Sequence, residues 1–237
     1  LEKAGVTKDD ILHIAFGYGL FTGGLGLHYG AEKLGCIVVP AAAGNTIRQI
    51  QLLKDFKATV LVCTPSYALV LHESIKKAGM DMKDFNLRLG IFGAEPWSLS
   101  MKKDIEQKFG IQAFDIYGLS EISGPGVAIS CKCCDMLHVW DDIFYPEVVD
   151  TETLESLPDG EEGELVFTTL QKEGMPLIRY RTRDITILEH KKCKSGHQCT
   201  HMRRITGRSD DMLIIRGVNV FPSQIESVLF NINEIEA

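Results

Sequence analysis

The chain has 237 residues, enough to bury a sizeable core, and its 45% hydrophobic and 24% charged residues are ordinary values for a globular protein. A formal net charge of −7 argues against a general nucleic-acid-binding protein, which needs a basic surface. No apolar run approaches the roughly 20 residues that a membrane-spanning helix requires, so neither nucleic acid nor a membrane is expected as a partner.

Short apolar runs alternate with helical patterns up to about residue 125. Two helices are expected, over 46–56 and over 98–110, the second opening at a serine and ending at a glycine. The first has four apolar side chains at helical spacing: Ile47, Ile50, Leu53 and Phe56. The apolar runs suit five buried strands: 11–17, 36–40, 58–64, 87–92 and 111–117. This alternation predicts an α/β fold with a mostly parallel sheet covered on both faces.

From about residue 136 the sequence becomes typical of β-rich structure. Short strand patterns are separated by turns: 147–150, 163–170 and 176–182. After "GRSDD" come an apolar strand pattern and, from Pro222 and Ser223, the start of a helix. We expect a large domain over 1–208, followed over 209–237 by a hinge and the beginning of a small α+β domain.

Ligands of open α/β sheets bind beyond the carboxyl ends of the strands, and three expected strand ends are unusual. The first is "FGYGLFTGGLGLHYG" (16–30), which mixes glycines with aromatic residues. One interpretation is a helix start loosened by glycine. The other is a pocket wall, with Tyr18 and Phe21 against backbone bare enough for a ligand to approach.

The other two strand ends are "GAEPW" (93–97) and "DIYGLSE" (115–121). The first exposes peptide groups at a Gly-Ala corner. In the second, Tyr117 offers a flat face for a base and Glu121 offers oxygen to a hard cation such as Mg²⁺, which would hold a triphosphate.

Two later stretches carry charge. "YRTRD" (180–184) sets Asp184 among arginines, where an ion pair is the simple interpretation. "GRSDDMLIIRG" (207–217) carries Arg208 before an acidic pair, and its simple interpretation is an ordinary turn.

Taken in order, "GAEPW", "DIYGLSE", "RYRTRD" and "ITGRSDDMLIIRGVNVFPSQIE" resemble the adenylate-forming acyl-CoA synthetases, and within them the branch that activates arylacetic acids. The resemblance covers nearly the whole chain. It implies two half-reactions. A carboxylate attacks the α-phosphorus of MgATP to give an acyl-adenylate and pyrophosphate, and the thiol of coenzyme A then displaces AMP.

The resemblance also implies residue roles. Glu121 corresponds to the Mg²⁺ carboxylate, Asp184 to the acceptor of the ribose hydroxyls, Arg208 to a phosphate-facing arginine and Asp210 to the hinge, and these four form the expected catalytic set. The expected nucleotide contacts are Gly93, Ala94, Glu95, Pro96, Asp115, Ile116, Tyr117, Gly118, Ser120, Asp184 and Arg208. The expected acid pocket is Tyr18, Phe21, Gly93 and Ala94.

Five of the seven cysteines are crowded at 131–134 and 193–199. Because no secretory signal opens the chain, a cytoplasmic location is expected and clustered cysteines indicate metal ligands more than disulfides. The resemblance implies a zinc-binding turn before the hinge, with these ligands: Cys131, His138, Cys193 and Cys199. The competing ligands are Cys133, Cys134, His197 and His201. The alternative is that the cysteines are reduced and solvated.

Two parts that the resemblance implies are missing from the sequence: a Ser/Thr/Gly-rich phosphate loop and a distal catalytic lysine. The expectation is therefore a fragment that is catalytically incomplete. Its partners would be an aromatic acid and coenzyme A, with ATP or AMP, Mg²⁺ and structural Zn²⁺ as cofactors and a homodimer as the assembly considered. The alternatives are a relative that adenylates for a carrier protein or a deazaflavin cofactor, and a non-catalytic, zinc-stabilised nucleotide-binding module.

Overall fold

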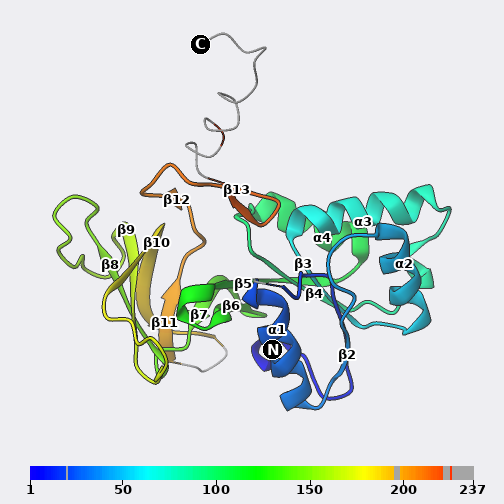
Figure 1. Cartoon of the computed structure of the whole chain (residues 1–237), viewed down its shortest axis with the longest axis horizontal. Coiled ribbons are helices and arrows are strands. Elements are labelled where there is room, and N and C mark those ends of the chain that lie inside the picture. Colours follow the sequence, from blue (N-terminus) through cyan, green and yellow to red (C-terminus); the bar gives the residue numbers. More distant parts are fainter. Residues whose placement is uncertain (20, 195–197, 221–224, 226–237) are drawn as a thin grey trace, which may run out of the picture.

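A twelve-stranded sheet runs through the molecule, in the order β2-β1-β3-β4-β5-β6-β7-β11-β10-β9-β8 with β12 beside β10 (Figure 1). The structure, a computed structural model, describes residues 1–19, 21–194, 198–220 and 225. The first five strands in this order pair in parallel: β2 (Ile37–Val39), β1 (Ile11–Ile14), β3 (Val60–Cys63), β4 (Leu89–Gly93) and β5 (Gln112–Leu119). The expected α/β class is confirmed.

Helices cover both faces of this parallel part. The helices are α1 (Thr22–Leu34), α2 (Thr46–Asp55), α3 (Pro65–Lys77) and α4 (Leu99–Phe109). Side chains alternate across a strand, so Leu61 and Cys63 of β3 join one core with α2, α3 and α4, while Val60 and Val62 join the other core with α1. This double burial explains why the strands are continuous apolar runs.

Helix α4 agrees with its expected limits and α2 ends one residue before its own, but the expected apolar face of α2 is buried only in part. The Ser98 hydroxyl accepts a hydrogen bond from the Met101 amide at 3.1 Å, and Gly110 ends α4 in the left-handed conformation. In α2, Ile50 and Leu53 are buried as expected. Ile47 and Phe56 are 81% and 51% exposed, however, so the expected apolar face is wrong at both ends.

Two further helices were not expected as such. Helix α3 begins at Pro65 after Thr64, whose hydroxyl accepts from the Tyr67 amide. Helix α1 occupies most of the glycine-rich stretch 16–30, in line with the helix interpretation. Its Gly24 is needed for close approach, because a Cβ there would lie 2.5 Å from the carbonyl oxygen of Gly17.

The second half of the sheet is antiparallel and begins at β5, which pairs in parallel with β4 and antiparallel with β6. Its strands are β6 (Gly124–Cys131), β7 (Cys134–Val139), β8 (Phe144–Val149), β9 (Glu162–Thr169), β10 (Tyr180–Lys192), β11 (Gln198–Met202) and β12 (Gly207–Arg208). They enclose a third core that includes Phe144, Phe167 and Leu188. The expected β-rich region is thus present, although β10 is longer and later than the pattern at 176–182.

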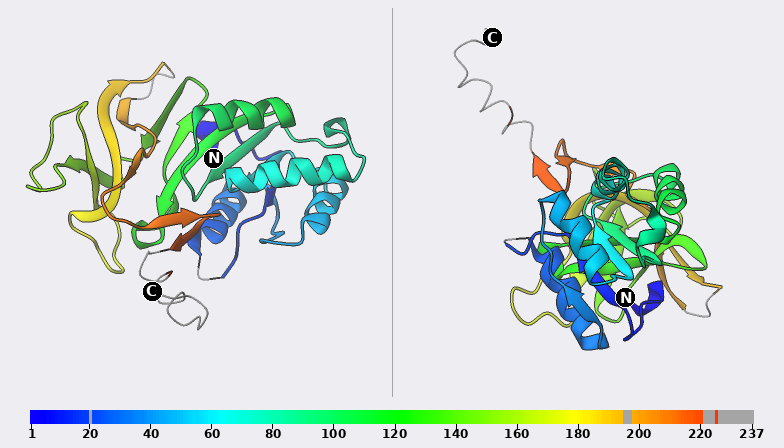
Figure 2. Two further views of the ribbon diagram at one scale, coloured as in Figure 1. Left: turned by 90° about the horizontal axis from the view of Figure 1, so that it is seen from above. Right: turned by 90° about the vertical axis from the view of Figure 1, so that its right-hand side faces the viewer.

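After β12 the chain forms a separate hairpin of β13 (Leu213–Ile215) and β14 (Val218–Val220), seen at the top of Figure 1 and from above in Figure 2. Its turn uses Arg216 and Gly217, both at positive φ, as such a tight hairpin requires. A Cβ on Gly217 would lie 3.2 Å from Thr64 and 3.8 Å from Ala94, so the turn lies against the start of α3 and the loop after β4. The helix expected from Pro222 and Ser223 lies outside the described residues.

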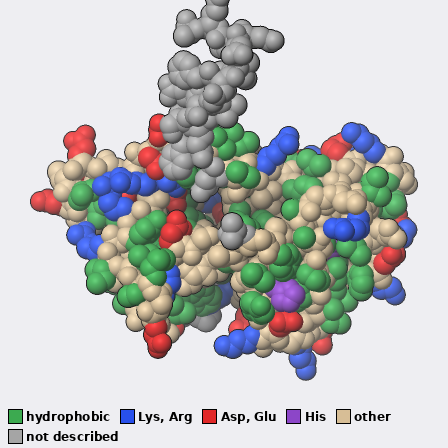
Figure 3. Space-filling view, viewed as in Figure 1, with side chains coloured by type: hydrophobic (Ala, Val, Ile, Leu, Met, Phe, Trp, Pro, Cys, Tyr) green, Lys and Arg blue, Asp and Glu red, His purple; other side chains and the backbone are tan. Residues whose placement is uncertain are grey.

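Among the described residues, no helix is long and apolar enough to cross a membrane. On the face shown in Figure 3, basic and acidic side chains are interspersed over both halves of the molecule.

Candidate functional site

Three segments distant in sequence meet at Asp184. Strand β12 pairs with β10 so that Asp184 lies opposite Arg208, and Tyr117 reaches the same carboxylate from β5. The Tyr117 hydroxyl donates to Oδ2 at 2.6 Å, and Nη1 of Arg208 donates to Oδ1 at 2.7 Å. Burial raises the pKa of Asp184, an effect that the hydrogen bond from Tyr117 and the charge of Arg208 oppose.

Arg208 also binds Asp210 with the other side of its guanidinium group. Its Nε and Nη2 atoms donate to the two carboxylate oxygens at 2.7 and 3.0 Å. These hydrogen bonds lower the pKa of Asp210. The structure thus brings together the predicted Tyr117, Asp184, Arg208 and Asp210 in one chain of charge-assisted contacts.

Ser120 and Glu121 lie just beyond β5, in a 3₁₀ turn over Ser120–Ile122. The Ser120 hydroxyl lies 3.1 Å from that of Thr22, at the start of α1. The Glu121 side chain is exposed, and the amino group of Lys172 donates to its main-chain oxygen. Burial and the Glu121 carboxylate raise the pKa of Tyr180, which places this tyrosine beside the predicted Mg²⁺ ligand.

The turn after β4 is held by close backbone packing. A Cβ on Gly93 would lie 2.2 Å from the carbonyl oxygen of Ile116, so only glycine fits, and Ala94 has a positive φ of 67°. The Glu95 carboxylate accepts from the Ser66 amide at 2.6 Å, at the start of α3. Glu95 was predicted as a nucleotide contact, and in the structure its carboxylate binds the N-terminal end of α3.

The predicted residues of β5 divide between its two faces. Ile116 packs into the core with α1. Asp115 is buried on the opposite face, where its Oδ2 lies 2.9 Å from Nη1 of Arg204. Burial raises the pKa of Asp115, and the charge of Arg204 opposes this.

Tyr18 and Phe21 flank the start of α1. Both pack, with Ala94, against the buried cluster that contains Phe16, so the structure brings three of the four predicted acid-pocket residues to one apolar cluster. The Tyr18 hydroxyl lies 3.2 Å from Nδ1 of His28. Burial and the charge of Glu32 raise the pKa of Tyr18 to about 12.

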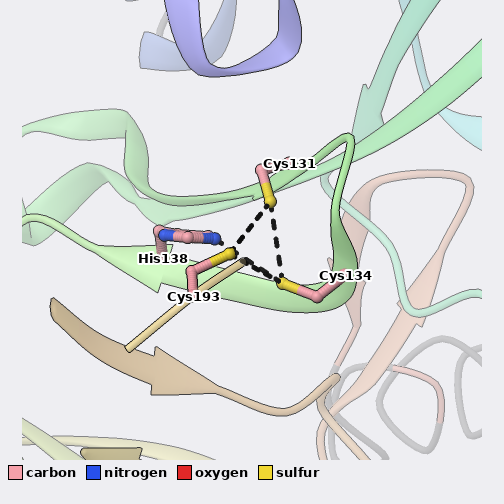
Figure 4. A group of neighbouring side chains, drawn as sticks. All are labelled: Cys131, Cys134, His138 and Cys193. Carbon is pink, nitrogen blue, oxygen red and sulfur yellow. Dashed lines mark hydrogen bonds between the residues drawn. The ribbon is translucent and has the colours of Figure 1, made fainter. Parts of the chain in front are cut away.

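A second group of functional side chains joins the β6–β7 turn to the segment after β10 (Figure 4). Cys131, Cys134, His138 and Cys193 place one ligand atom each within 4.8 Å of one another. The sulfur–sulfur distances are 3.6, 3.7 and 3.9 Å, and Nε2 of His138 lies 3.6 Å from the Cys134 sulfur. A tetrahedron of sulfurs about 2.3 Å from a zinc ion has edges of about 3.8 Å, so the donor set fits zinc in both chemistry and size.

Cys199 contacts this group from outside. Its sulfur lies 3.0 Å from Nδ1 of His138, a distance shorter than a tetrahedral ligand edge and suited to a hydrogen bond. His201 packs beside His138 with ring centroids 4.5 Å apart, is 1% exposed, and has no hydrogen-bond partner on either ring nitrogen among the described residues. The structure thus gathers three of the four predicted zinc ligands with Cys134. It gathers the fourth, Cys199, in a second group with His138 and His201, whose ligand atoms also lie within 4.8 Å of one another. Cys133 is exposed, and His197 lies outside the described residues.

Sequence reasoning gave no role to two buried charged contacts near the site. Glu164 is fully buried, accepts a two-pronged interaction from Arg181 at 2.8 and 2.7 Å, and accepts from the Ser209 hydroxyl at 2.7 Å. It therefore anchors the residue between Arg208 and Asp210. The second contact is that of Arg204 with Asp115. An arginine in a loop gives no sequence pattern from which this contact could have been predicted.

Comparisons with known proteins show relatives over nearly the whole chain. A family model described as AMP-binding enzyme matches residues 5–171. The chain is 54% identical to the phenylacetate-coenzyme A ligase of Pseudomonas putida over 99% of its own length and 53% of that protein. It is 54% identical to the Escherichia coli K12 ligase of the same name, over 95% of the chain and 52% of that protein. The chain thus spans about half the length of the curated relatives it matches.

Solved structures give the same result for the fold. A crystal structure of 2-hydroxyisobutyryl-CoA ligase, in complex with 2-HIB-AMP and CoA in the thioesterification state, superposes with a TM-score of 0.92 at 29% identity. The match covers 98% of this chain and 50% of that one. ATP-bound MatB from Rhodopseudomonas palustris shares the fold at 20% identity and a TM-score of 0.64, over 99% of this chain and 47% of that one.

Proposed function

Because the chain belongs to the family of AMP-binding enzymes, we propose that the protein activates an arylacetic acid as its acyl-adenylate and passes the acyl group to coenzyme A. The observation that carries the proposal is the identity of 51–55% to phenylacetate-coenzyme A ligases over nearly the whole chain. The convergence of Tyr117, Asp184 and Arg208 supports it, because these residues offer an aromatic face, an acceptor pair and a cation within one contact network.

The ribose would bind by exchange of hydrogen bonds at Asp184. A carboxylate only accepts, and both of its oxygens already receive donors from protein groups. The two ribose hydroxyls can supply equivalent donors, so little desolvation is added when they replace or share these contacts. The Tyr117 ring of β5 would then lie beside the base of the nucleotide, whose ribose is bound at Asp184.

Arg208 would act on the phosphates from the same network. Its guanidinium group is held by Asp184 and Asp210, which fixes its direction before a nucleotide arrives. Such preorganised charge stabilises the charge that develops when a carboxylate attacks a phosphorus atom. Mg²⁺, held at Glu121, would neutralise phosphate oxygens when bound.

We further propose Asp210 as a hinge between a large domain over 1–208 and a small one from 209. The Glu164–Ser209 and Arg208–Asp210 contacts support the proposal, because they hold the chain against the large domain up to Asp210, so that a rotation would begin there. The β13–β14 hairpin, which pairs only with itself among the described strands, lies just beyond.

The test of adenylation uses the complete gene product with ATP, Mg²⁺ and a panel of arylacetic, aromatic and aliphatic acids. We expect pyrophosphate release that depends on an arylacetic acid, and thioester formation once coenzyme A is added. Glu121→Gln should lower turnover at least tenfold and leave the melting temperature within about 2 °C, because its side chain is exposed. Glu161→Gln, the same change on another exposed side chain, is the matched control and should leave turnover unchanged.

Two outcomes would contradict the proposal. Absence of acid-dependent pyrophosphate release across the panel would exclude the ligase function and favour a non-catalytic nucleotide-binding module. Pyrophosphate release without any thioester would show that the adenylate has another acceptor.

We also propose that Cys131, Cys134, His138 and Cys193 hold one structural zinc ion. The tetrahedral spacing of their donor atoms supports this, as does the hydrogen bond by which Cys199 orients the His138 ring. Bound zinc would tie the β6–β7 turn to the segment after β10, which adds ligand-binding energy to the stability of the antiparallel half.

The zinc proposal predicts about one equivalent of zinc in protein prepared from zinc-replete medium, measured by elemental analysis. Cys134→Ser should lose the metal and lower the melting temperature. Cys133→Ser, the exposed neighbour, should do neither. Cys199→Ser should keep the metal with about 10- to 100-fold lower affinity, as expected for a residue that orients a ligand. Loss of zinc in Cys199→Ser together with full retention in Cys134→Ser would reverse the assignment.

A further inference from the structure

We propose that Arg204 is a positioning residue for the nucleotide: it fixes the turn after β4 against strand β5 and so sets the shape of the adenine wall. The inference rests on the proposed function, since it concerns the same nucleotide site. It is supported by a separate observation, however: one guanidinium group contacts both the turn after β4 and strand β5, the two segments that form the proposed wall.

Arg204 makes three contacts at once. Its Nη1 atom lies 2.9 Å from the Asp115 carboxylate on β5 and 3.3 Å from the main-chain oxygen of Trp97. The guanidinium carbon lies 4.9 Å from the centre of the Trp97 ring. Trp97 closes the turn that begins at Gly93, so the arginine bridges that turn and the strand.

The surroundings of these contacts are largely dry. Side-chain exposure is 16% for Arg204 and 12% for Asp115, and Trp97 is 8% exposed. Trp97 also packs edge-on against Phe92 of β4 at 5.7 Å. In such surroundings an arginine–carboxylate contact and a cation–π contact are stronger than on an exposed surface.

Arginine suits this position better than lysine would. A lysine could keep the charge beside Asp115, but a compact ammonium group cannot lie over the indole ring while it also reaches the Trp97 oxygen and the Asp115 carboxylate. The ion pair with Asp115 therefore requires only a positive charge, whereas the placement of the turn after β4 requires the planar guanidinium group. The Arg204→Lys substitution can therefore distinguish a role in placing the turn from a role in neutralising Asp115.

Arg204 also links the wall to the phosphate side of the site. It lies four residues before Arg208, in the short segment between β11 and β12. The Arg203 and Thr206 amides donate to the main-chain oxygens of Ile187 and Ile185 of β10 at 2.9 and 3.0 Å. These hydrogen bonds hold the segment in place against β10. One connected path thus runs from the turn after β4 through Arg204 to the Asp184–Arg208 pair.

The test compares AMP binding, ATP kinetics and stability in Arg204→Lys and in Arg203→Ala. Arg203 is the matched control, because it is adjacent, 54% exposed and paired with Glu189 at the surface. Calorimetry should give an AMP dissociation constant about tenfold higher in Arg204→Lys, a loss of roughly 1.4 kcal/mol. KM for ATP should rise by the same factor, kcat should stay within twofold, and the melting temperature should change little. Arg203→Ala should match the unaltered protein in all four.

Trp97 fluorescence adds a spectroscopic readout in a Trp140→Phe background, which leaves one tryptophan. AMP should change the emission of Trp97 in the unaltered chain and change it less in Arg204→Lys. If Arg204→Lys does not fold, the pair Arg204→Met with Asp115→Asn replaces it, because no buried charge is then left alone.

The outcomes separate this inference from the proposed function. A folded Arg204→Lys with unaltered AMP affinity overturns the inference, whatever the enzyme catalyses. Weaker AMP binding in this variant supports the inference even if no acid is activated, in which case only the ligase function is lost. If the unaltered protein binds no AMP, both are overturned.

Discussion

At the scale of single residues, buried ionisable groups are stabilised in two different ways. Asp10 is 3% exposed, and burial alone would raise its pKa, but Arg88, Thr7 and Thr59 donate to it and lower the pKa to about 2. His13 is hydrogen-bonded to the neutral Gln49 and is fully buried, so burial lowers its pKa to about 4. The first group is charged in the folded protein and the second is neutral.

The hydrogen bonds around His13 fix its tautomer. The amide nitrogen of Gln49 donates to the carbonyl oxygens of Ala42 and Gly44 at 2.7 and 3.0 Å, so its oxygen must face the ring. That oxygen lies 2.5 Å from Nε2 of His13, which therefore carries the proton. Gln49 in turn holds the loop before α2, a role that its position on the buried face of a helix did not reveal.

His13 makes the stability of the protein pH-dependent. Its folded pKa of about 4 lies below the unfolded value of about 6.5. Its contribution is therefore complete above about pH 6.5 and is lost as the pH falls towards 4, by about 3 kcal/mol. Denaturant unfolding at several pH values should show this loss in the original protein and not in His13→Met. Equal pH dependence in the two proteins would contradict the prediction.

At the scale of elements, the sequence predicted the parts that follow from apolar periodicity and end signals. The strands of the parallel half and helix α4, with Ser98 and Gly110 at its ends, needed nothing more than local pattern. The apolar face of α2 was wrong because Ile47 and Phe56 match the helical period yet face solvent, while the polar Gln49 is buried. Period alone does not say which side of a helix meets the sheet.

The residues of the candidate site were likewise predictable from the sequence only in part. Motif order identified Tyr117, Asp184 and Arg208, which the structure brings into contact. Neither Cys134 nor Arg204 could be selected by spacing, because their partners, Cys193 and Asp115, come close only through the pairing of distant strands. The neighbours Cys133 and Cys134 differ in exposure for the same reason.

Gly118 illustrates how one residue sets the geometry of two strands. A Cβ there would lie 2.2 Å from the carbonyl oxygen of Gly124 and 2.8 Å from Cα of Pro125, both backbone atoms of β6. Gly118→Ala should therefore push the start of β6 outward and destabilise the protein by about 2 kcal/mol in denaturant unfolding. Gly174→Ala is the control, because a Cβ there meets nothing within 4 Å. Equal stability of the two variants would show that β6 can shift at no cost.

At the scale of the whole molecule, the described chain carries more groups for the nucleoside than for the outer phosphates. Tyr117 and Asp184 are the proposed contacts of the base and ribose, whereas Arg208 and Glu121 are the predicted phosphate-side contacts. The sequence contains no Ser/Thr/Gly-rich loop that would cradle the β- and γ-phosphates with backbone amides.

The 237-residue chain should consequently bind AMP and MgATP with dissociation constants within about tenfold of each other, a difference below roughly 1.4 kcal/mol. Titration calorimetry of the purified chain with both nucleotides measures this. A preference for MgATP well above tenfold would show that further phosphate contacts exist in this chain.

The position of β5 between a parallel and an antiparallel neighbour has a consequence for how the molecule opens. Residues 112–116 pair with β4 and residues 116–119 pair with β6, so the amides of the ladders that meet at Ile116 exchange hydrogen with solvent only when the sheet itself separates. The Ala113 and Asp115 amides donate instead to the side chains of Glu106 and Ser130. The turn at 94–98 and the segment at 120–123 lie outside these ladders and can exchange by small local openings. The middle of β5, the proposed wall for the base, therefore belongs to the slowest-exchanging part of the protein, and the turn at 94–98 and the segment at 120–123 exchange faster.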